Sequence, residues 1–275
     1  MDAEMITSRQ NPLVKLICGL AEKKKRVASG LFRFDGIKLL GELLETDVAP
    51  EYVVLREDAD QRALLLAKTA AQKGARVLTV SESVFEKMTD ERSPEGVITV
   101  AKMPTDIHST ASADSIDALI KDRRRILLVE SLRDPGNLGT VIRSCYALGI
   151  ECLVLTSDCA DLYNPKTVRA AMGAIFKLPT LTVAEGMLPD YISSLKKSGR
   201  AVYAAALHHD ALTLGEIELC VGDCFVIGNE GHGLDEATVE ACTAPVVIPM
   251  REGAESLNAS AAAAICIWET VRAKT

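Results

Sequence analysis

Apolar residues recur along this chain in two alternating patterns, one typical of helices and one typical of buried strands. Between residues 11 and 28, Leu13, Leu16, Ile17 and Leu20 follow helical spacing, and Ser29-Gly30 is a stop signal. The rest of the first hundred residues predicts strands at 31–34, 52–55, 76–80 and 96–100, with helices at 37–44 and 61–72. This alternation predicts a small α/β domain.

The second half alternates again, with strands rich in Leu, Val and Ile. The predicted strands are 126–130, 152–156, 178–183, 201–206, 224–228 and 245–249, and the predicted helices are 137–148, 166–175, 188–198, 235–242 and 256–272. Such a pattern indicates a parallel sheet covered by helices on both faces. Residues 101–114, rich in Pro, Thr and Ser, resemble a linker. We therefore predict domains at 1–104 and 105–275.

Composition narrows the class of protein. A chain of 275 residues that is 48% hydrophobic and 25% charged can bury one large core or two modest ones. Its first ten residues lack a signal-peptide pattern, and the apolar run 259–268 is about half of a membrane span. The eight cysteines form no CxxC pair, so we expect reduced, buried thiols and no metal site. These features predict a cytoplasmic protein without a membrane anchor.

Charge is unevenly distributed. The net charge of −7 argues against a protein wrapped in nucleic acid. Residues 1–41 nevertheless hold eight basic and four acidic side chains, and 121–125 adds four cations around one Asp. The run from Lys23 to Arg26 fits either the solvated end of a helix or a contact with nucleic acid. Taken alone, its charge favours the helix end.

Three loops that follow predicted strands carry unusual residues, and in parallel sheets ligands bind at such loops. In the first, 130–143, Asn137 either caps a helix or faces a ligand, and Arg143 either forms a surface ion pair or acts in function. In the second, 225–234, the glycine order G-x-x-G-x-G excludes a dinucleotide fingerprint. There Glu230 is a ligand-facing carboxylate or a turn residue, and His232 fits a loop tip.

The third loop, 246–260, leads into an alanine-rich helix. Ser256, Asn258 and Ser260 lie where that helix begins, and one of them is expected to cap it. Three small polar residues interleaved with Leu257 and Ala259 exceed what capping requires. The loop is therefore a further candidate for ligand binding.

Together the three loops resemble the signature motifs of the SpoU family of RNA methyltransferases, within the SPOUT superfamily. The matching residues are Asp134, Pro135, Asn137, Gly139 and Arg143, then Gly228, Glu230 and Gly233, then Ile248, Pro249, Met250, Ser256, Leu257, Asn258 and Ser260. Two positions depart from the family's pattern: Ala259 stands where the family often has Val, and Cys145 where it more often has Ala. Both residues are small and apolar, so the resemblance still holds. The opening from Ile6 to Pro12 and the basic helix after it are similar to the family's N-terminal substrate-binding domain.

The resemblance implies methylation of a ribose 2'-hydroxyl in RNA with S-adenosylmethionine as cofactor and without a metal. It implies catalytic or organising roles for Arg143, Asn137, Glu230, Ser256 and Asn258. It implies cofactor contacts at Leu207, Gly228, Ile248, Met250 and Leu257, and RNA contacts at Arg9, Lys23, Lys24, Lys25 and Arg26. Arg143 either assists deprotonation or, because arginine keeps its proton, binds phosphate and stabilises the alkoxide.

The resemblance also implies a trefoil knot in the C-terminal domain and a homodimer whose active site draws on both subunits. Ribosomal RNA is the favoured substrate, with transfer RNA as the alternative. A non-catalytic RNA-binding homologue is a rival, which retention of Asn137, Arg143, Glu230 and Asn258 disfavours. A nucleotide-dependent metabolic enzyme is a second rival, and the chain lacks the phosphate loop that such an enzyme would need.

Overall fold

A computed structural model describes residues 5–110 and 125–273, which form two compact units. The first unit comprises the chain up to Pro104 together with Asp161–Phe176, and the second comprises Thr105–Ala160 and the residues from Lys177 onward. Residues 111–114 of the predicted linker lie outside the described residues. So do residues 121–124 of the basic run 121–125. None of the helices in the described residues is long and apolar enough to cross a membrane.

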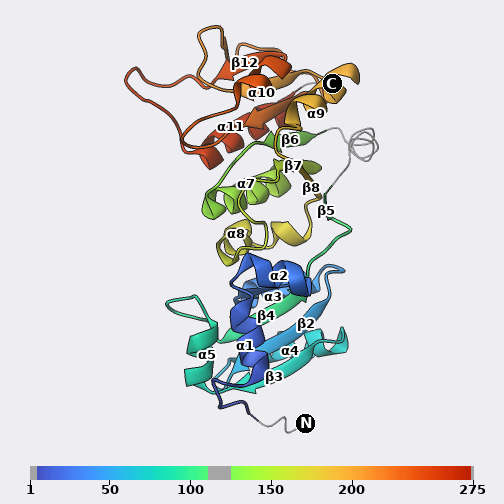
Figure 1. The fold of residues 1–275 in the computed structure, drawn as a ribbon, viewed down its shortest axis with the longest axis vertical. Coiled ribbons are helices and arrows are strands. Elements are labelled where there is room, and N and C mark those ends of the chain that lie inside the picture. Colours follow the sequence, from blue (N-terminus) through green and yellow to red (C-terminus); the bar gives the residue numbers. More distant parts are fainter. Residues whose placement is uncertain (1–4, 111–124, 274–275) are drawn as a thin grey trace. The chain divides into compact units, whose positions relative to one another are not determined.

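The first unit is built on a four-stranded mixed sheet in the order β1-β4-β2-β3 (Figure 1). Its strands are β1 (Leu31–Asp35), β2 (Pro50–Arg56), β3 (Arg76–Val80) and β4 (Val97–Lys102). Its helices are α1 (Pro12–Gly19), α2 (Lys23–Ser29), α3 (Ile37–Leu44), α4 (Gln61–Gln72), α5 (Glu82–Met88) and α8 (Pro165–Ala171), with a 3-10 turn at Ala174–Phe176. Apolar clusters pack on both faces of the sheet.

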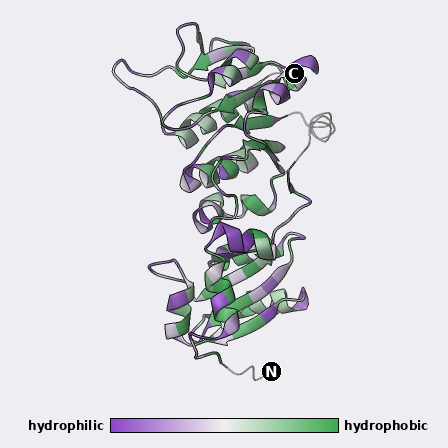
Figure 2. Cartoon of the chain, viewed as in Figure 1, coloured by the Kyte–Doolittle hydropathy of each residue, from purple (hydrophilic) through white to green (hydrophobic). Residues whose placement is uncertain are grey.

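The expected single helix over 11–28 is wrong, because the structure divides it into α1 and α2. Arg26 causes the break: its guanidinium donates to the carbonyl oxygens of Leu20 (2.7 Å) and Ala21 (2.8 Å), which would otherwise accept bonds within a continuous helix. The same guanidinium pairs with Asp161, from the segment that packs with this unit. Figure 2 shows α2 as a strongly hydrophilic helix beside apolar strands.

The second unit confirms the predicted parallel sheet. Its eight strands pair in the order β10-β12-β9-β11-β6-β7-β8-β5, and every registered pair is parallel. The strands are β5 (His108–Thr110), β6 (Ile126–Val129), β7 (Cys152–Thr156), β8 (Thr180–Val183), β9 (Val202–Ala205), β10 (Leu212–Thr213), β11 (Cys224–Ile227) and β12 (Ala244–Val247).

Among the described residues of the second unit, four helices cover this sheet: α7 (Pro135–Leu148), α9 (Leu188–Lys197), α10 (Glu236–Ala241) and α11 (Ala259–Arg272). Helix α11 packs against α7, and α10 packs against α9. Ile126, Leu128, Val154 and Val226 are buried in one apolar cluster with residues of α9. Because all these strands run in parallel, the loops after β6, β9, β11 and β12 meet at one edge of the sheet.

Candidate active site

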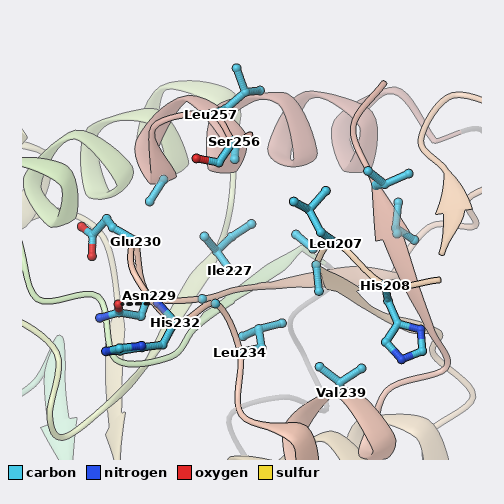
Figure 3. Close-up of a pocket in the computed structure, with 18 of the residues that line it drawn as sticks. Leu207, His208, Ile227, Asn229, Glu230, His232, Leu234, Val239, Ser256 and Leu257 are labelled. Atoms are coloured by element: carbon cyan, nitrogen blue, oxygen red, sulfur yellow. Dashed lines mark hydrogen bonds between the residues drawn. The ribbon is translucent and has the colours of Figure 1, made fainter. Parts of the chain in front are cut away.

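A cavity of about 640 Å³ opens at the carboxyl ends of β9, β11 and β12. Figure 3 shows Leu207 and His208 on one side of it and Asn229, Glu230 and His232 on the other, with Ile227 and Leu234 between them. The volume lies within the range of roughly 300–1,000 Å³ that is typical of small-molecule sites. All five residues expected to contact a cofactor line this cavity: Leu207, Gly228, Ile248, Met250 and Leu257.

The lining of this cavity is apolar and acidic. Glu230, Glu236 and Glu240 are the acidic residues of the lining, and within the described part of the chain no Lys or Arg lines the cavity. Such a lining is poorly suited to a phosphate-bearing ligand, which would meet like charge without a compensating cation. It suits a ligand with an apolar ring system and a positive centre. S-adenosylmethionine, which carries an adenine and a sulfonium, fits both requirements.

One chain of hydrogen bonds joins the three motif loops. The Nδ2 of Asn137 donates to Oε1 of Glu230 (2.8 Å), and the Nδ2 of Asn258 donates to Oδ1 of Asn137 (2.9 Å). The Oδ1 of Asn258 in turn accepts from the Ser260 amide (2.9 Å) and hydroxyl (2.6 Å) at the start of α11. The side chain of Asn137 is therefore held from two directions at the edge of the cavity.

The helix caps explain how Asn137 and Asn258 reach one another. Asp134 caps α7 by accepting from the Asn137 amide (2.7 Å), which leaves the Asn137 side chain available to the other loops. Asn258 is the N-cap of α11, and the same residue supplies the donor to Asn137. Ser256 is exposed and lines the cavity beside Leu257.

The loop after β11 folds tightly upon itself. The amide of Asn229 donates to the carbonyl of Gly233 (2.8 Å), and the Gly233 amide donates back (3.0 Å). A Cβ at Gly228 would lie 2.5 Å from the backbone of Gly233, so only glycine fits there without a shift of the loop. His232 is exposed, lines the cavity and donates its amide to Oδ1 of Asn229 (3.2 Å).

Arg143 lies apart from this network. It is exposed on α7 and does not line the cavity, and its side chain bonds to no other described residue. Six residues along a helix correspond to about 9 Å of rise and a rotation of roughly 240°, so Arg143 and Asn137 face different directions. Tyr146, one turn further along α7, shares the face of Arg143 and is 48% exposed.

The basic residues of the first unit divide into two groups. Lys23, Lys24 and Lys25 are exposed on α2, with Lys25 paired to Glu22 at 2.7 Å, and exposed Arg9 donates to the Ser83 carbonyl (2.9 Å). Arg26 is only 2% exposed and is used within the unit. The expectation that Arg26 contacts RNA does not fit this placement, because its guanidinium already holds two carbonyls and a carboxylate.

Sequence reasoning missed several residues around the cavity. Glu236, Val239 and Glu240 of α10 line it, and His208 lies at its edge, although no spacing in the sequence singles them out. His208, His209 and Asp210 bring three potential metal ligands together at an exposed position. Asn229 could have been suspected from its place between two motif residues, since a glycine-flanked Asn often hydrogen-bonds the backbone two residues on.

The parallel sheet, the cavity at its strand ends and the three motif loops beside it fit an S-adenosylmethionine-dependent RNA methyltransferase, and the comparisons with known proteins show that class. Residues 124–268 match the model of the SpoU rRNA Methylase family, and residues 11–99 match that of the MRM3-like substrate binding domain. The chain belongs to the SpoU rRNA methylase family.

Relatives span the whole chain. The 23S rRNA (guanosine(2553)-2'-O)-methyltransferase RlmP of Bacillus subtilis is 32% identical over 96% of this chain and 98% of its own length. The AdoMet-bound rRNA methyltransferase of Sinorhizobium meliloti superposes with a TM-score of 0.84 at 27% identity, covering 98% of both chains. The AviRb methyltransferase of Streptomyces viridochromogenes, solved with AdoMet, gives 0.79 at 26% identity over 95% of this chain and 98% of its own.

Proposed function

We propose that this chain transfers a methyl group from S-adenosylmethionine to a ribose 2'-hydroxyl of ribosomal RNA. The observation that carries the proposal is the hydrogen-bonded chain from Glu230 through Asn137 to Asn258. It brings the three motif loops together beside a cavity whose lining suits a cationic, adenine-bearing ligand. The relatives named as 23S rRNA 2'-O-methyltransferases support ribosomal RNA as the substrate.

The cavity residues Leu207, Gly228, Ile248, Met250 and Leu257 would hold the cofactor, which supplies an electrophilic methyl group when bound. The glycine at 228 lets the neighbouring backbone approach closely, and the apolar side chains exclude water from the adenine. Glu230, Asn258 and Ser256 organise the edge of the cavity. Asn137, held between two of them, is the residue that we assign to positioning the ribose.

Arg143 provides the cation for the substrate. An arginine keeps its proton in proteins, so it is unsuited to accept the proton of the hydroxyl. Its planar guanidinium instead binds a phosphate of the RNA and stabilises the ribose oxygen as negative charge develops on it. The ribose oxygen would bond to the methyl carbon as the carbon–sulfur bond breaks, which leaves S-adenosylhomocysteine, and the hydroxyl proton would pass to the RNA phosphate held by Arg143 and on to solvent.

The placement of Arg143 supports a homodimer with a shared active site. Within one chain Arg143 lies outside the cavity, and Tyr146 beside it and Ile265 and Trp268 on α11 are 48%, 37% and 50% exposed. Helices α7 and α11 pack against each other, and Arg143 lies on α7, so we take the exposed apolar side chains of these two helices as one surface. Large exposed apolar groups of this kind favour burial against another protein surface. We assign this surface to the dimer, with Arg143 of one subunit serving the cavity of the other.

We propose a division of roles between the two parts of the chain. Residues 1–104 would bind RNA through Lys23, Lys24, Lys25 and Arg9, and residues 105–275 would carry out methyl transfer in a knotted domain. The family matches at 11–99 and 124–268 support this division. The knot belongs to the proposal because the chain is a member of this family. An enzyme acting on ribosomal RNA would work in the cytoplasm.

Transfer of labelled methyl from S-adenosylmethionine into separate pools of unmodified ribosomal and transfer RNA tests the proposal. The product is scored for alkali-resistant linkages, which mark 2'-O-methylation. We expect incorporation into ribosomal RNA that is lost in Arg143→Ala and kept in Arg62→Ala, an exposed arginine of α4 that lies neither at the cavity nor on α7 or α11. Incorporation into transfer RNA alone would overturn the substrate assignment. No incorporation in either pool, despite measured cofactor binding, would overturn the reaction.

A further inference from the structure

Glu130 is a buried carboxylate that none of the roles above uses. It lies directly after β6 and is 5% exposed. Its Oε2 accepts from the Asp235 amide (2.9 Å), and its Oε1 accepts from the Thr238 hydroxyl (2.5 Å). Burial raises the pKa of the Glu130 carboxyl, while these two hydrogen bonds lower it. Burying a carboxylate costs free energy unless it is hydrogen-bonded, and here both oxygens are bonded to the same helix, α10.

Glu130 replaces the cap that α10 lacks. Asp235 is the N-cap residue of α10, yet its side chain makes no capping hydrogen bond. The Glu130 carboxylate instead accepts from the amide of this N-cap residue and from the Thr238 hydroxyl, and it lies at the helix end where the dipole favours negative charge. The start of α10 is therefore fixed to the end of β6, which lies 105 residues earlier in the chain.

The next residue holds the other end of the same loop. The carbonyl of Ser131 accepts from Nδ2 of Asn229 (2.7 Å), directly after β11. Ser131 adopts a φ of 54°, which is uncommon for a residue with a side chain, and its amide donates to Oγ1 of Thr156 (2.9 Å). The bond to Thr156, the last residue of β7, holds Ser131 in this left-handed backbone conformation directly after β6.

We infer that Glu130 is a positioning residue for cofactor binding. With the Ser131 carbonyl it forms a clamp on the segment Asn229–Thr238, with one hydrogen bond at the Asn229 end and two at the Asp235–Thr238 end. That segment carries Glu230, which orients Asn137, and it continues into the α10 wall of the cavity. The inference rests on the proposed function in one respect, the assignment of this cavity to the cofactor.

A clamp matters here because the segment is rich in glycine. Gly231 and Gly233 lose more backbone entropy on ordering than other residues do. If the segment were free, ligand binding would have to order it, and the affinity would fall accordingly. Because both ends of the segment are already fixed in the free protein, ligand binding does not have to order it. The clamp therefore raises the affinity for the cofactor without contacting it.

Equilibrium binding of S-adenosylhomocysteine to the full chain is the first test. In Glu130→Ala we expect the dissociation constant to rise about tenfold or more, the size of one or two lost hydrogen bonds. Glu130→Gln should stay within about threefold, because its amide can accept from Asp235 and donate to the Thr238 oxygen. Thr238→Val should weaken binding by about threefold. Thr180→Val, which removes an equally buried hydroxyl from β8, should leave binding unchanged.

Hydrogen exchange in the protein without ligand separates the clamp from general destabilisation. In Glu130→Ala, amides of Asn229–Thr238 should exchange at least tenfold faster, while those of β7 keep their protection. Glu130→Gln should restore slow exchange. Equal loss of protection in both segments, or no change in either, would overturn the inference.

A further variant distinguishes failure of the clamp from failure of the cavity assignment. Gly228→Ala forces a Cβ against the backbone of Gly233 and should abolish binding of S-adenosylhomocysteine. If Gly228→Ala binds as the wild type does, this cavity is not the cofactor site and the proposed function fails. If Gly228→Ala loses binding and Glu130→Ala does not, only the clamp is overturned.

Discussion

Asn137→Asp tests whether the chain of hydrogen bonds between the motif loops exists in solution. The substitution keeps the size of the side chain and the oxygen that accepts from Asn258. It replaces the Nδ2 donor, 2.8 Å from Oε1 of Glu230, with an oxygen that carries negative charge. The new charge stabilises the start of α7 but repels the Glu230 carboxylate, so the size of each effect decides whether the free energy of unfolding rises or falls.

The favourable effect comes from the helix. Asn137 lies in the first turn of α7, where a negative charge contributes about 0.3–1 kcal/mol. Against it stands repulsion between two carboxylates, about 1 kcal/mol at 4 Å in water and about 4 kcal/mol at an effective dielectric constant of 20. The lost hydrogen bond to a charged group adds about 1.5–3 kcal/mol, reduced here because Glu230 is exposed. The repulsion and the lost hydrogen bond therefore outweigh the helix effect, and we expect the free energy of unfolding to fall by about 1–2 kcal/mol.

Chemical unfolding of Asn137→Asp at pH 7.5 and pH 4 measures this loss. The loss should shrink at pH 4, because the carboxyl introduced at position 137 is then partly protonated and repels less. The matched control is the double variant Asn137→Asp with Glu230→Gln, in which the new amide donates to the new carboxylate with the polarity reversed. We expect it to recover most of the stability at pH 7.5. If Asn137→Asp equals or exceeds the wild type at both pH values, only the helix effect operates and the Asn137–Glu230 bond is not formed.

Three further predictions concern other parts of the molecule. Gly228→Ala should destabilise the second unit by about 1–3 kcal/mol in chemical unfolding, because its Cβ would overlap the backbone of Gly233. Arg26→Ala should cost the first unit about 3–5 kcal/mol in the same assay, since it leaves the Asp161 carboxylate without its buried partner. Thiol titration at pH 8 should show Cys220, the exposed cysteine, reacting fast, whereas the six buried cysteines react only on unfolding. Burial raises the pKa of three of those thiols to about 12, which leaves little thiolate at pH 8: Cys224, Cys242 and Cys266.

Elements whose pattern is decided locally could be predicted from the sequence. Helix α4 (Gln61–Gln72) and strands β3 (Arg76–Val80) and β7 (Cys152–Thr156) occur with the predicted bounds. In each, apolar periodicity and the flanking turn residues agree with the burial that the fold imposes. The alternation of strands and helices along the chain, and the motif loops that follow the strands, were predictable for the same reason, whereas the order of strands within the sheet was not predicted.

Elements that depend on distant partners were missed. Strand β5 (His108–Thr110) is polar and falls in the predicted linker, yet it pairs with β8 at the edge of the sheet. Edge strands tolerate polar residues because one side remains solvated. Strand β10, two residues long, and helix α5 (Glu82–Met88) are too short for periodicity to reveal. The break between α1 and α2 depends on Arg26, whose ion-pair partner lies 135 residues away.

The site shows why sequence alone could not separate structural roles from functional ones. Asn137 and Asn258 were each open to interpretation as helix caps or as ligand-facing residues. In the structure the cap of α7 is Asp134, which leaves Asn137 available to the network. Asn258 does both: its oxygen caps α11 while its amide nitrogen donates to Asn137. An asparagine amide has an acceptor and a donor that point in different directions. One side chain can therefore begin a helix and join that helix to another loop, and only the three-dimensional arrangement identifies which residues do so.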